Sequence, residues 1–302
     1  MASSRNTHPI AFFAYKRDEH ARKALIALQN NVGFDPSLLH IFCDGARRAA
    51  DVAQVEQTRS VIRETVSSES AIVYRNENWG LAKSIIAGVS ELTKKFGTVI
   101  VLEDDLITSP HFLSYMNRAL DLYANEKTVM QVSGFMFPVS AISSDDAFFL
   151  PLTTSWGWAT WHRAWEHFDP SMHKLSLLDN SKSLRYEFDL RGSCPYYKMI
   201  CSQREKKIDS WAIRWYLSVF LNSGLTLYPR TSLIANIGFD GSGTHCASEQ
   251  SNELLSDCEI TGFPSVELNR AVTRQVVDHL RHQNRWWNKL WRRCLAKLAK
   301  LA

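Results

Sequence analysis

Residues 98–105 read TVIVLEDD, five apolar or β-branched residues followed by three acidic ones. A continuous run of this kind is typical of a strand that is buried on both faces of a parallel sheet. Three adjacent carboxylates repel one another, so a fold tolerates them best on a solvated surface or around a cation. The stretch therefore predicts a central strand whose end faces solvent or a metal ion.

Short apolar runs alternate with helical patterns on both sides of this stretch. The expected strands are 9–15, 38–42, 71–74, 98–102 and 229–237. Helical spacing of apolar residues predicts helices over 18–30, 49–66, 79–95, 109–123 and 211–222. Strands that alternate with helices of this length predict an α/β fold with a mostly parallel sheet and helices on both faces.

Polar clusters follow three of the expected strands, at 16–18, 43–45 and 103–105. In open parallel sheets, ligands bind beyond the carboxyl ends of the strands. We therefore expect a ligand site where these three clusters meet. The acidic cluster alone leaves two interpretations open. It could hold Mg²⁺ or Mn²⁺ against a diphosphate, or it could be an acidic loop beside the N-terminus of a helix.

Composition excludes several classes of protein. The chain has 302 residues, of which 45% are hydrophobic and 22% charged, unlike a disordered or collagen-like chain. Its net charge of +4 hides an asymmetry, because 270–302 carry +8 and 1–269 therefore carry −4. An acidic body argues against a nucleic-acid partner.

The basic C-terminal segment has a helical pattern, with Arg and Lys on one side and an apolar stripe on the other, formed by Val276, Leu280, Trp287, Leu290, Trp291, Leu295 and Leu298. This pattern predicts an amphipathic helix that docks on an anionic membrane surface through 272–302. A helix packed on the rest of the protein, or a contact between copies, stays open. The start, 1–8, is short and polar, and the six Cys form no CxxC pair. We therefore expect a cytoplasmic protein, peripheral at the inner face of the cytoplasmic membrane.

Seven short motifs together resemble a known family. Residues 99–116, VIVLEDDLITSPHFLSYM, are similar to the metal-binding segment of the mannosyl-glycoprotein β-1,2-N-acetylglucosaminyltransferase family, which has the GT-A fold. The other motifs follow in that family's order: AYKR at 14–17, CDG at 43–45, RNENWGLA at 75–82, SWGW at 155–158, DSW at 209–211, and the stretch 229–245. The tryptophan-rich 155–165 is more similar to bacterial relatives of such enzymes.

The resemblance covers 9–245 and implies a domain organisation. A GT-A catalytic domain over 1–265 would comprise a donor-binding half, about 8–132, and an acceptor half, about 133–265, followed by the amphipathic helix, 266–302. It also implies an inverting, metal-dependent glycosyltransferase. Such an enzyme moves a sugar from a nucleotide-sugar donor, here a UDP-sugar, to a hydroxyl of a glycan or lipid-linked saccharide.

The resemblance also implies roles for individual residues. Asp105 and His245 would hold Mn²⁺ or Mg²⁺, while Arg17 would face the donor diphosphate. The remaining donor contacts would be Asp44 to uracil, Asn76 on the base side, Asp104 to the ribose and Glu103 to the donor sugar. The family's uracil-side His is replaced here by Asn76, so the base is less firmly implied than the metal.

The acceptor side has competing interpretations. Asp209 would be the general base, although Asp is also common as a helix N-cap, and this chain has DSW where the family has DDW. Trp156 and Trp158 would stack on sugar rings, although core packing is the commoner role of Trp. Two other functions stay open: a non-catalytic glycan-binding or membrane scaffold, and an NDP-sugar nucleotidyltransferase. A nucleotidyltransferase is expected to have a Gly-rich loop after the first strand, whereas residues 15–19 contain no Gly.

Overall fold

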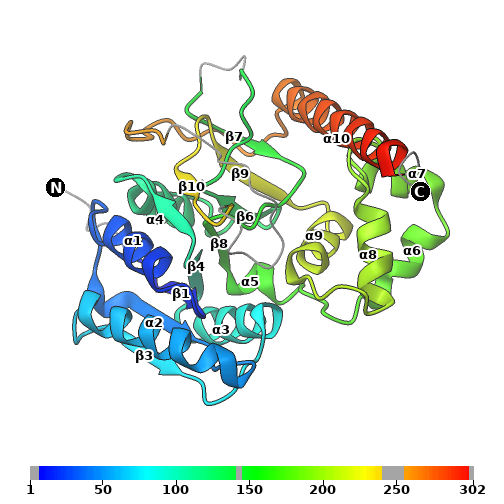
Figure 1. Cartoon of the computed structure of the whole chain (residues 1–302). Coiled ribbons are helices and arrows are strands. Elements are labelled where there is room, and N and C mark those ends of the chain that lie inside the picture. The colour runs from blue at the N-terminus through cyan, green and yellow to red at the C-terminus, as the bar shows by residue number, and fades with distance from the viewer. Residues whose placement is uncertain (1–6, 141–144, 240–254, 299–302) are drawn as a thin grey trace.

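The computed structural model describes residues 7–140, 145–239 and 255–298, and for 285–298 it describes the helix backbone alone. An eight-stranded sheet forms the centre, and helices pack on both of its faces (Figure 1). A small sheet joins two further strands, β5 and β10. The predicted α/β class, with helices on both faces of a large sheet, is confirmed.

The strand order in the large sheet is β3-β2-β1-β4-β8-β6-β9-β7. The strands are β1 Ile10–Ala14, β2 Leu39–Cys43, β3 Ala71–Tyr74, β4 Thr98–Glu103, β6 Val129–Ser133, β7 Ala147–Leu150, β8 Trp158–Trp161 and β9 Leu225–Pro229. The four strands from β3 to β4 are parallel, as are β6 and β9. β8 is antiparallel to both of its neighbours, and β7 is antiparallel to β9.

The N-terminal half follows the predicted alternation closely. Its helices are α1 Asp18–Gln29, α2 Val52–Thr65, α3 Leu81–Phe96 and α4 Phe112–Leu122, with 3-10 turns at Pro36–Leu38 and Ala49–Asp51. β1, β2 and β3 are added outward in chain order, and β4 then lies on the other side of β1. This reversal creates a topological switch point between β1 and β4, the position where open α/β sheets bind ligands.

The side chains of β1 point alternately to the two faces of the sheet, which explains why both faces are covered by helices. Ile10 and Phe12 belong to the core beneath α1, α2 and α4, whereas Ala11 and Phe13 belong to the core beneath α3, α5 and α9. All four residues are buried. Since successive side chains of a strand point to opposite faces, a continuously apolar strand needs a helix layer on each side.

The C-terminal half departs from the predicted pattern. The tryptophan-rich segment contributes β8, which lies in the middle of the sheet between β4 and β6. The single strand predicted over 229–237 is wrong, because β9 ends at Pro229 and a separate strand, β10 Ile234–Asn236, pairs with β5 Leu106–Thr108. Pro229 has no N–H with which to continue a ladder.

The remaining helices are short except for the last two. They are α5 His162–Trp165, α6 Ser176–Asp179, α7 Lys182–Phe188, α8 Tyr196–Arg204, α9 Trp211–Leu221 and α10 Arg270–Leu298, with a 3-10 turn at His173–Leu175. α9 confirms the helix expected over 211–222. No helix in the described part of the chain is long and apolar enough to cross a membrane.

The predicted C-terminal helix exists as α10, and its first part packs on the protein (Figure 1). Val272, Val276 and Leu280 are buried in the core of the C-terminal half. The Asn284 amide donates to the Ser193 carbonyl at 2.6 Å. Val276 and Leu280 are on the stripe predicted to face lipid, so for this part of the helix that prediction is wrong. Residues 270–284 instead fit the alternative interpretation, a helix packed on the rest of the protein.

Candidate active site

The switch point brings Arg17 to the carboxylates that follow β4. Arg17 leaves the end of β1, and Asp104 and Asp105 leave the end of the adjacent β4, where Phe13 is in register with Glu103. The Arg17 Nη2 donates to Asp104 Oδ1 at 2.5 Å and to Asp105 Oδ2 at 3.0 Å. Parallel strands end at the same edge of a sheet, which explains how residues 87 positions apart in the chain meet.

A second segment reaches the same edge through the small sheet. β5 begins directly after Asp105, and its partner β10 ends two residues before Gly238. The Ile237 N–H donates to the Asp105 carbonyl at 2.9 Å, and the Gly238 N–H donates to Asn236 Oδ1 at 2.7 Å. The β5–β10 ladder therefore places the backbone of Gly238 against Asp105.

The position of Gly238 has room for no side chain. A Cβ there would lie 2.4 Å from Asp105 Oδ2, 2.9 Å from Arg17 Nη1 and 3.1 Å from Asn236 Oδ1. A side chain at this position would therefore have to displace the ends of the Asp105 and Arg17 side chains. We call Arg17, Asp104, Asp105 and Gly238 the Arg17 cluster.

Charges at this edge are out of balance, with three carboxyl groups facing one guanidinium. Burial raises the pKa of Asp104 to about 6, although Arg17 opposes this shift. Burial, and then the charges of Asp105 and Asp104, raise the pKa of Glu103 to about 8. Burial also disfavours the charged form of Arg17, but the two aspartates outweigh it and raise its pKa. A surplus of negative charge in a partly desolvated site favours a bound cation.

The donor set fits a hard divalent cation that shares its coordination with a substrate. Among the residues that the structure describes, no three His, Cys, Asp or Glu side chains are grouped as a complete metal site. Mg²⁺ and similar ions commonly use one or two carboxylates, with phosphate oxygens and water completing the shell. Asp105 meets that requirement, since its side chain is 16% exposed, whereas Asp104 is 5% exposed and also accepts from the Tyr15 N–H.

Asp44 has a clear structural role. It follows β2 and is buried, and its carboxylate accepts from the backbone N–H groups of Gly45, Trp79 and Gly80 at 2.9 to 3.2 Å. Gly80 is the N-cap residue of α3. Asp44 therefore fixes the start of α3 to the end of β2. Its predicted contact with a base would be in addition to these bonds and stays a prediction.

Asn76 lies beside this anchor. A Cβ on Gly45 would lie 2.6 to 2.8 Å from the backbone of Asn76 and Glu77, so the two loops are in close contact. Asn76 itself is exposed. The neighbouring Arg75 is buried, with its guanidinium 4.2 Å from the Trp79 ring centre. Asp44 and Asn76 are thus adjacent, as their proposed common role requires.

The two candidate sugar-stacking tryptophans lie in different surroundings. Trp156 is partly exposed, and its ring is 5.5 Å from that of Phe239, next to the Arg17 cluster. Trp158 is fully buried, with Trp211 stacked on it at 5.0 Å. A ring with no exposed face cannot stack on a sugar, so the prediction for Trp158 is corrected to core packing.

Asp209 lies just before α9, and its side chain is 70% exposed. It is not the helix cap, because Ser210 is the N-cap residue and accepts from the Ile213 N–H. The Asp209 carboxylate accepts from Arg214 Nη2 at 2.8 Å. Both residues line a groove of about 270 Å³ whose other lining residues all come from α3: Lys83, Ile86, Ala87 and Ser90. The groove does not include the Arg17 cluster.

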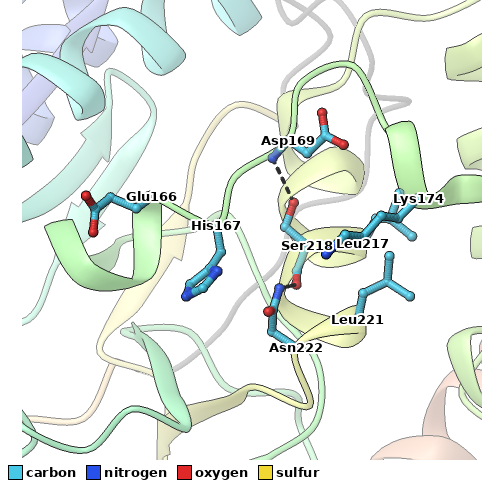
Figure 2. A pocket seen from close by; sticks show the side chains of 8 residues that line it. All are labelled: Glu166, His167, Asp169, Lys174, Leu217, Ser218, Leu221 and Asn222. Atoms are coloured by element: carbon cyan, nitrogen blue, oxygen red, sulfur yellow. Dashed lines mark hydrogen bonds between the residues drawn. The ribbon is translucent and has the colours of Figure 1, made fainter.

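Another hollow, of about 220 Å³, lies between α9 and the segment 166–174 that follows α5 (Figure 2). Asp169 and Ser218 both line it, and the Asp169 N–H donates to Ser218 Oγ. The Asp169 carboxylate accepts from the N–H groups of Ser171 and His173. The polar groups of Asp169 are thus used in hydrogen bonds within the turn at 169–173 and to Ser218. We therefore assign this hollow no role in the site. The predicted metal ligand His245 lies outside the described residues.

Three residues that contact the candidate site residues were not singled out from the sequence: Asn236, Phe239 and Arg214. Asn236 stands two residues before a glycine, a spacing typical of an Asx turn. Phe239 and Arg214 carry no local signal, because their importance comes from neighbours that are distant in the chain.

No protein-family model matches this sequence, and no curated protein matches it. Many solved structures are similar to the chain, among them three of low sequence identity. The mannosyltransferase PcManGT from Pyrobaculum calidifontis, in complex with GDP-Man and Mn²⁺, is 11% identical with a TM-score of 0.39, and 74% of this chain covers 73% of it.

Glucosyl-3-phosphoglycerate synthase from Mycobacterium tuberculosis, with Mn²⁺, UDP and glucosyl-3-phosphoglycerate, is 12% identical with a TM-score of 0.33. There, 54% of this chain covers 59% of the other. Mouse xyloside xylosyltransferase 1 in its apo form is 10% identical with a TM-score of 0.35, and 72% of this chain covers 82% of it. The function of this chain has to be argued from its own site.

Proposed function

We propose that this protein is a metal-dependent glycosyltransferase of the GT-A fold that takes its sugar from a nucleoside diphosphate donor. The observation that carries the proposal is the Arg17 cluster. A guanidinium and a surplus of carboxylates meet at the switch point between β1 and β4, where open α/β sheets bind nucleotides. A diphosphate can be bound by both charges at once, directly by the guanidinium and through a cation by the carboxylates.

The donor-side residues have distinct roles in this proposal. The planar Arg17 guanidinium binds diphosphate oxygens, and Asp105 holds Mn²⁺ or Mg²⁺, which as a Lewis acid stabilises charge on the departing nucleotide. Asp104 contacts the ribose and Glu103 the donor sugar. The adjacent Asp44 and Asn76 contact the nucleobase of the donor. The proposed contact of Asp44 with uracil favours UDP as the nucleotide.

Asp209 is the general base of the proposed reaction. It takes the proton from an acceptor hydroxyl while that oxygen attacks the anomeric carbon on the face opposite the nucleotide, which inverts the configuration. Its exposed carboxylate in the groove between α3 and α9 can reach an acceptor. Arg214 fixes the orientation of that carboxylate, and Trp156 supplies an apolar face beside the Arg17 cluster.

The proposed acceptor is a glycan or lipid-linked saccharide. The buried apolar side chains of α10 pack into the protein core, so we place contact with an anionic membrane at residues 285–302, which carry six Lys or Arg and no acid. This arrangement would leave the catalytic domain at the inner face of the cytoplasmic membrane, in the assembly of a surface polysaccharide.

Thermal unfolding with UDP, GDP and their sugars, each with and without Mn²⁺, tests the proposal. A ligand at about 100 times its Kd stabilises the folded protein by about 2.7 kcal/mol. We expect a shift in Tm that requires Mn²⁺, is largest with UDP compounds and is lost in Asp105→Asn. Glu19→Gln removes an exposed acid on α1 and serves as the control. Absence of any shift with every nucleotide contradicts the proposed donor site.

A further inference from the structure

The Arg17 guanidinium is bonded to Asp105, the carboxylate that the proposed function assigns to a cation, and also to the neighbouring Asp104. One nitrogen, Nη2, bridges Asp104 Oδ1 and Asp105 Oδ2 at 2.5 and 3.0 Å. The same guanidinium is the group proposed to bind the donor diphosphate. It cannot do both at once with the same nitrogen.

We infer that Arg17 is a placeholder cation, which neutralises Asp104 and Asp105 until donor and metal arrive and then turns from Asp105 to the donor diphosphate. The inference rests on the proposed function and deepens it. It predicts that the metal binds weakly to the free protein and that metal and nucleotide bind cooperatively.

Crowding around Asp105 makes the exchange necessary. The backbone of Gly238 closes one approach to Asp105 Oδ2, since a Cβ there would lie 2.4 Å from this oxygen and 2.9 Å from Arg17 Nη1. Arg17 Nη2 occupies another approach. A divalent ion on Asp105 would therefore lie within a few ångströms of a guanidinium, where like charges repel strongly.

The surroundings also make the exchange possible. Asp104 keeps a second donor, the Tyr15 N–H at 3.2 Å, when Arg17 turns away. Arg17 stands at the junction of β1 and α1 with its side chain 22% exposed, so its guanidinium borders solvent. A diphosphate offers it several charged acceptors in place of the one that it gives up.

Linkage sets the sign of the expected coupling. If the nucleotide draws Arg17 away from Asp105, it raises the affinity for the metal, and the metal must raise the affinity for the nucleotide by the same factor. Removing the Arg17 charge should strengthen metal binding to the free protein and abolish most of this coupling. A simple positioning role for Arg17 would instead weaken metal binding.

Binding of Mn²⁺, followed by the electron paramagnetic resonance signal of the free ion at pH 8, tests the inference without any turnover. Arg17→Gln should bind Mn²⁺ alone roughly tenfold more tightly than the wild type, and UDP should tighten Mn²⁺ binding roughly tenfold in the wild type but little in the variant. Lys16→Gln is the matched control. It removes the same charge one residue away, where Lys16 pairs with Asp51 at 2.7 Å, and it should leave both values nearly unchanged.

Equal or weaker Mn²⁺ binding by Arg17→Gln overturns the inference. If Arg17→Gln does not fold, Arg17→Lys replaces it, since the ammonium keeps a charge but lacks the planar fork. Its coupling between UDP and Mn²⁺ should then fall several-fold, and full coupling overturns the inference. If the wild type binds no Mn²⁺ even with UDP or GDP, the proposed function itself fails. Mn²⁺ binding that is normal with nucleotide but not enhanced in the variant removes only the placeholder role.

Discussion

Two regions that share strand β4 follow different rules. At its carboxyl end, Glu103, Asp104 and Asp105 face one guanidinium across an edge of the sheet. On one face of the sheet, where Val99 and Val101 of β4 point, lies the tryptophan cluster, which comprises Trp158, Trp165, Trp211 and Trp215. Its rings pack with centroids 5.0 to 6.4 Å apart. The first region is polar and in contact with solvent, and the second is dry.

The difference shows that a residue's type predicts its chemistry better than its exposure. Carboxylates that follow a buried strand are forced to the edge, because burying an unpaired charge is costly. A tryptophan is stable both in a core and against a sugar, so its place depends on what packs around it. Trp158 and Trp156 are two residues apart, yet only Trp156 has an exposed surface.

Asp209→Asn should have the largest effect, because it removes the proposed base beside the tryptophan cluster while leaving the Arg17 cluster intact. We expect kcat to fall by roughly 10²–10⁴, with Mn²⁺-dependent nucleotide binding unchanged. Turnover on a panel of saccharide acceptors and nucleotide-induced shifts in Tm measure the two quantities. A variant with normal kcat would show that another group removes the proton.

Trp158→Ala, in the tryptophan cluster, should lower the unfolding free energy much more than the loss of a tryptophan beside the charged edge. Truncating a fully buried tryptophan typically costs roughly 3–5 kcal/mol of unfolding free energy, and denaturant titration measures it. Trp156→Ala is the control, and because its ring is partly exposed it should cost clearly less. Similar losses in both variants would contradict the distinction between a core and a surface tryptophan.

Gly238→Ala should damage the Arg17 cluster more than the fold. The added methyl group would lie 2.4 Å from Asp105 Oδ2, so the Asp105 and Arg17 side chains or the loop must shift, at a cost of roughly 1–3 kcal/mol. We expect about a tenfold loss of Mn²⁺-dependent nucleotide affinity, corresponding to about 1.4 kcal/mol, measured by calorimetry. Gly33→Ala, at φ +82° with open space around it, should lower stability without changing that affinity.

The last prediction concerns a slope, the change of stability with pH in the absence of metal. Glu103 and Asp104 have folded-state pKa values of about 8 and about 6, above their ordinary values, so between about pH 4 and 8 the folded protein binds more protons than the unfolded chain. The contribution of this cluster to stability is therefore largest at low pH and falls as pH rises through this window, by at most about 1.4 kcal/mol per unit for each group.

Glu103→Gln should reduce that fall, and denaturant titrations at pH 5 to 8 compare the two slopes. Glu19→Gln, an exposed acid on α1, should keep the wild-type slope. A Glu103→Gln variant with the wild-type slope would show that the carboxyl groups at this edge titrate normally.

The sequence alone predicted the N-terminal half well, for a local reason. Each strand and helix there carries its own apolar period, and successive elements pack next to one another, as β1, α1 and β2 do. Arg17 and the triplet 103–105 could be placed together because carboxyl ends of parallel strands share an edge. The family resemblance implied a common role for Asp44 and Asn76, which lie next to each other in the structure. The bonds of Asp44 to the start of α3 could not be foreseen, because they depend on the relative position of two loops.

Tertiary structure decided the rest. β8 pairs with β4 on one side and β6 on the other, although it does not lie between them in the chain. This position in the middle of the sheet makes Trp158 a core residue. Val276 and Leu280 have the spacing of a membrane-binding stripe, but the core of the C-terminal half covers them. Periodicity along a chain shows that a surface is apolar and cannot show what will cover it. The charged edge was easier to place, because carboxylates are costly to bury alone and the end of a strand offers them both solvent and the guanidinium of Arg17 from the adjacent strand.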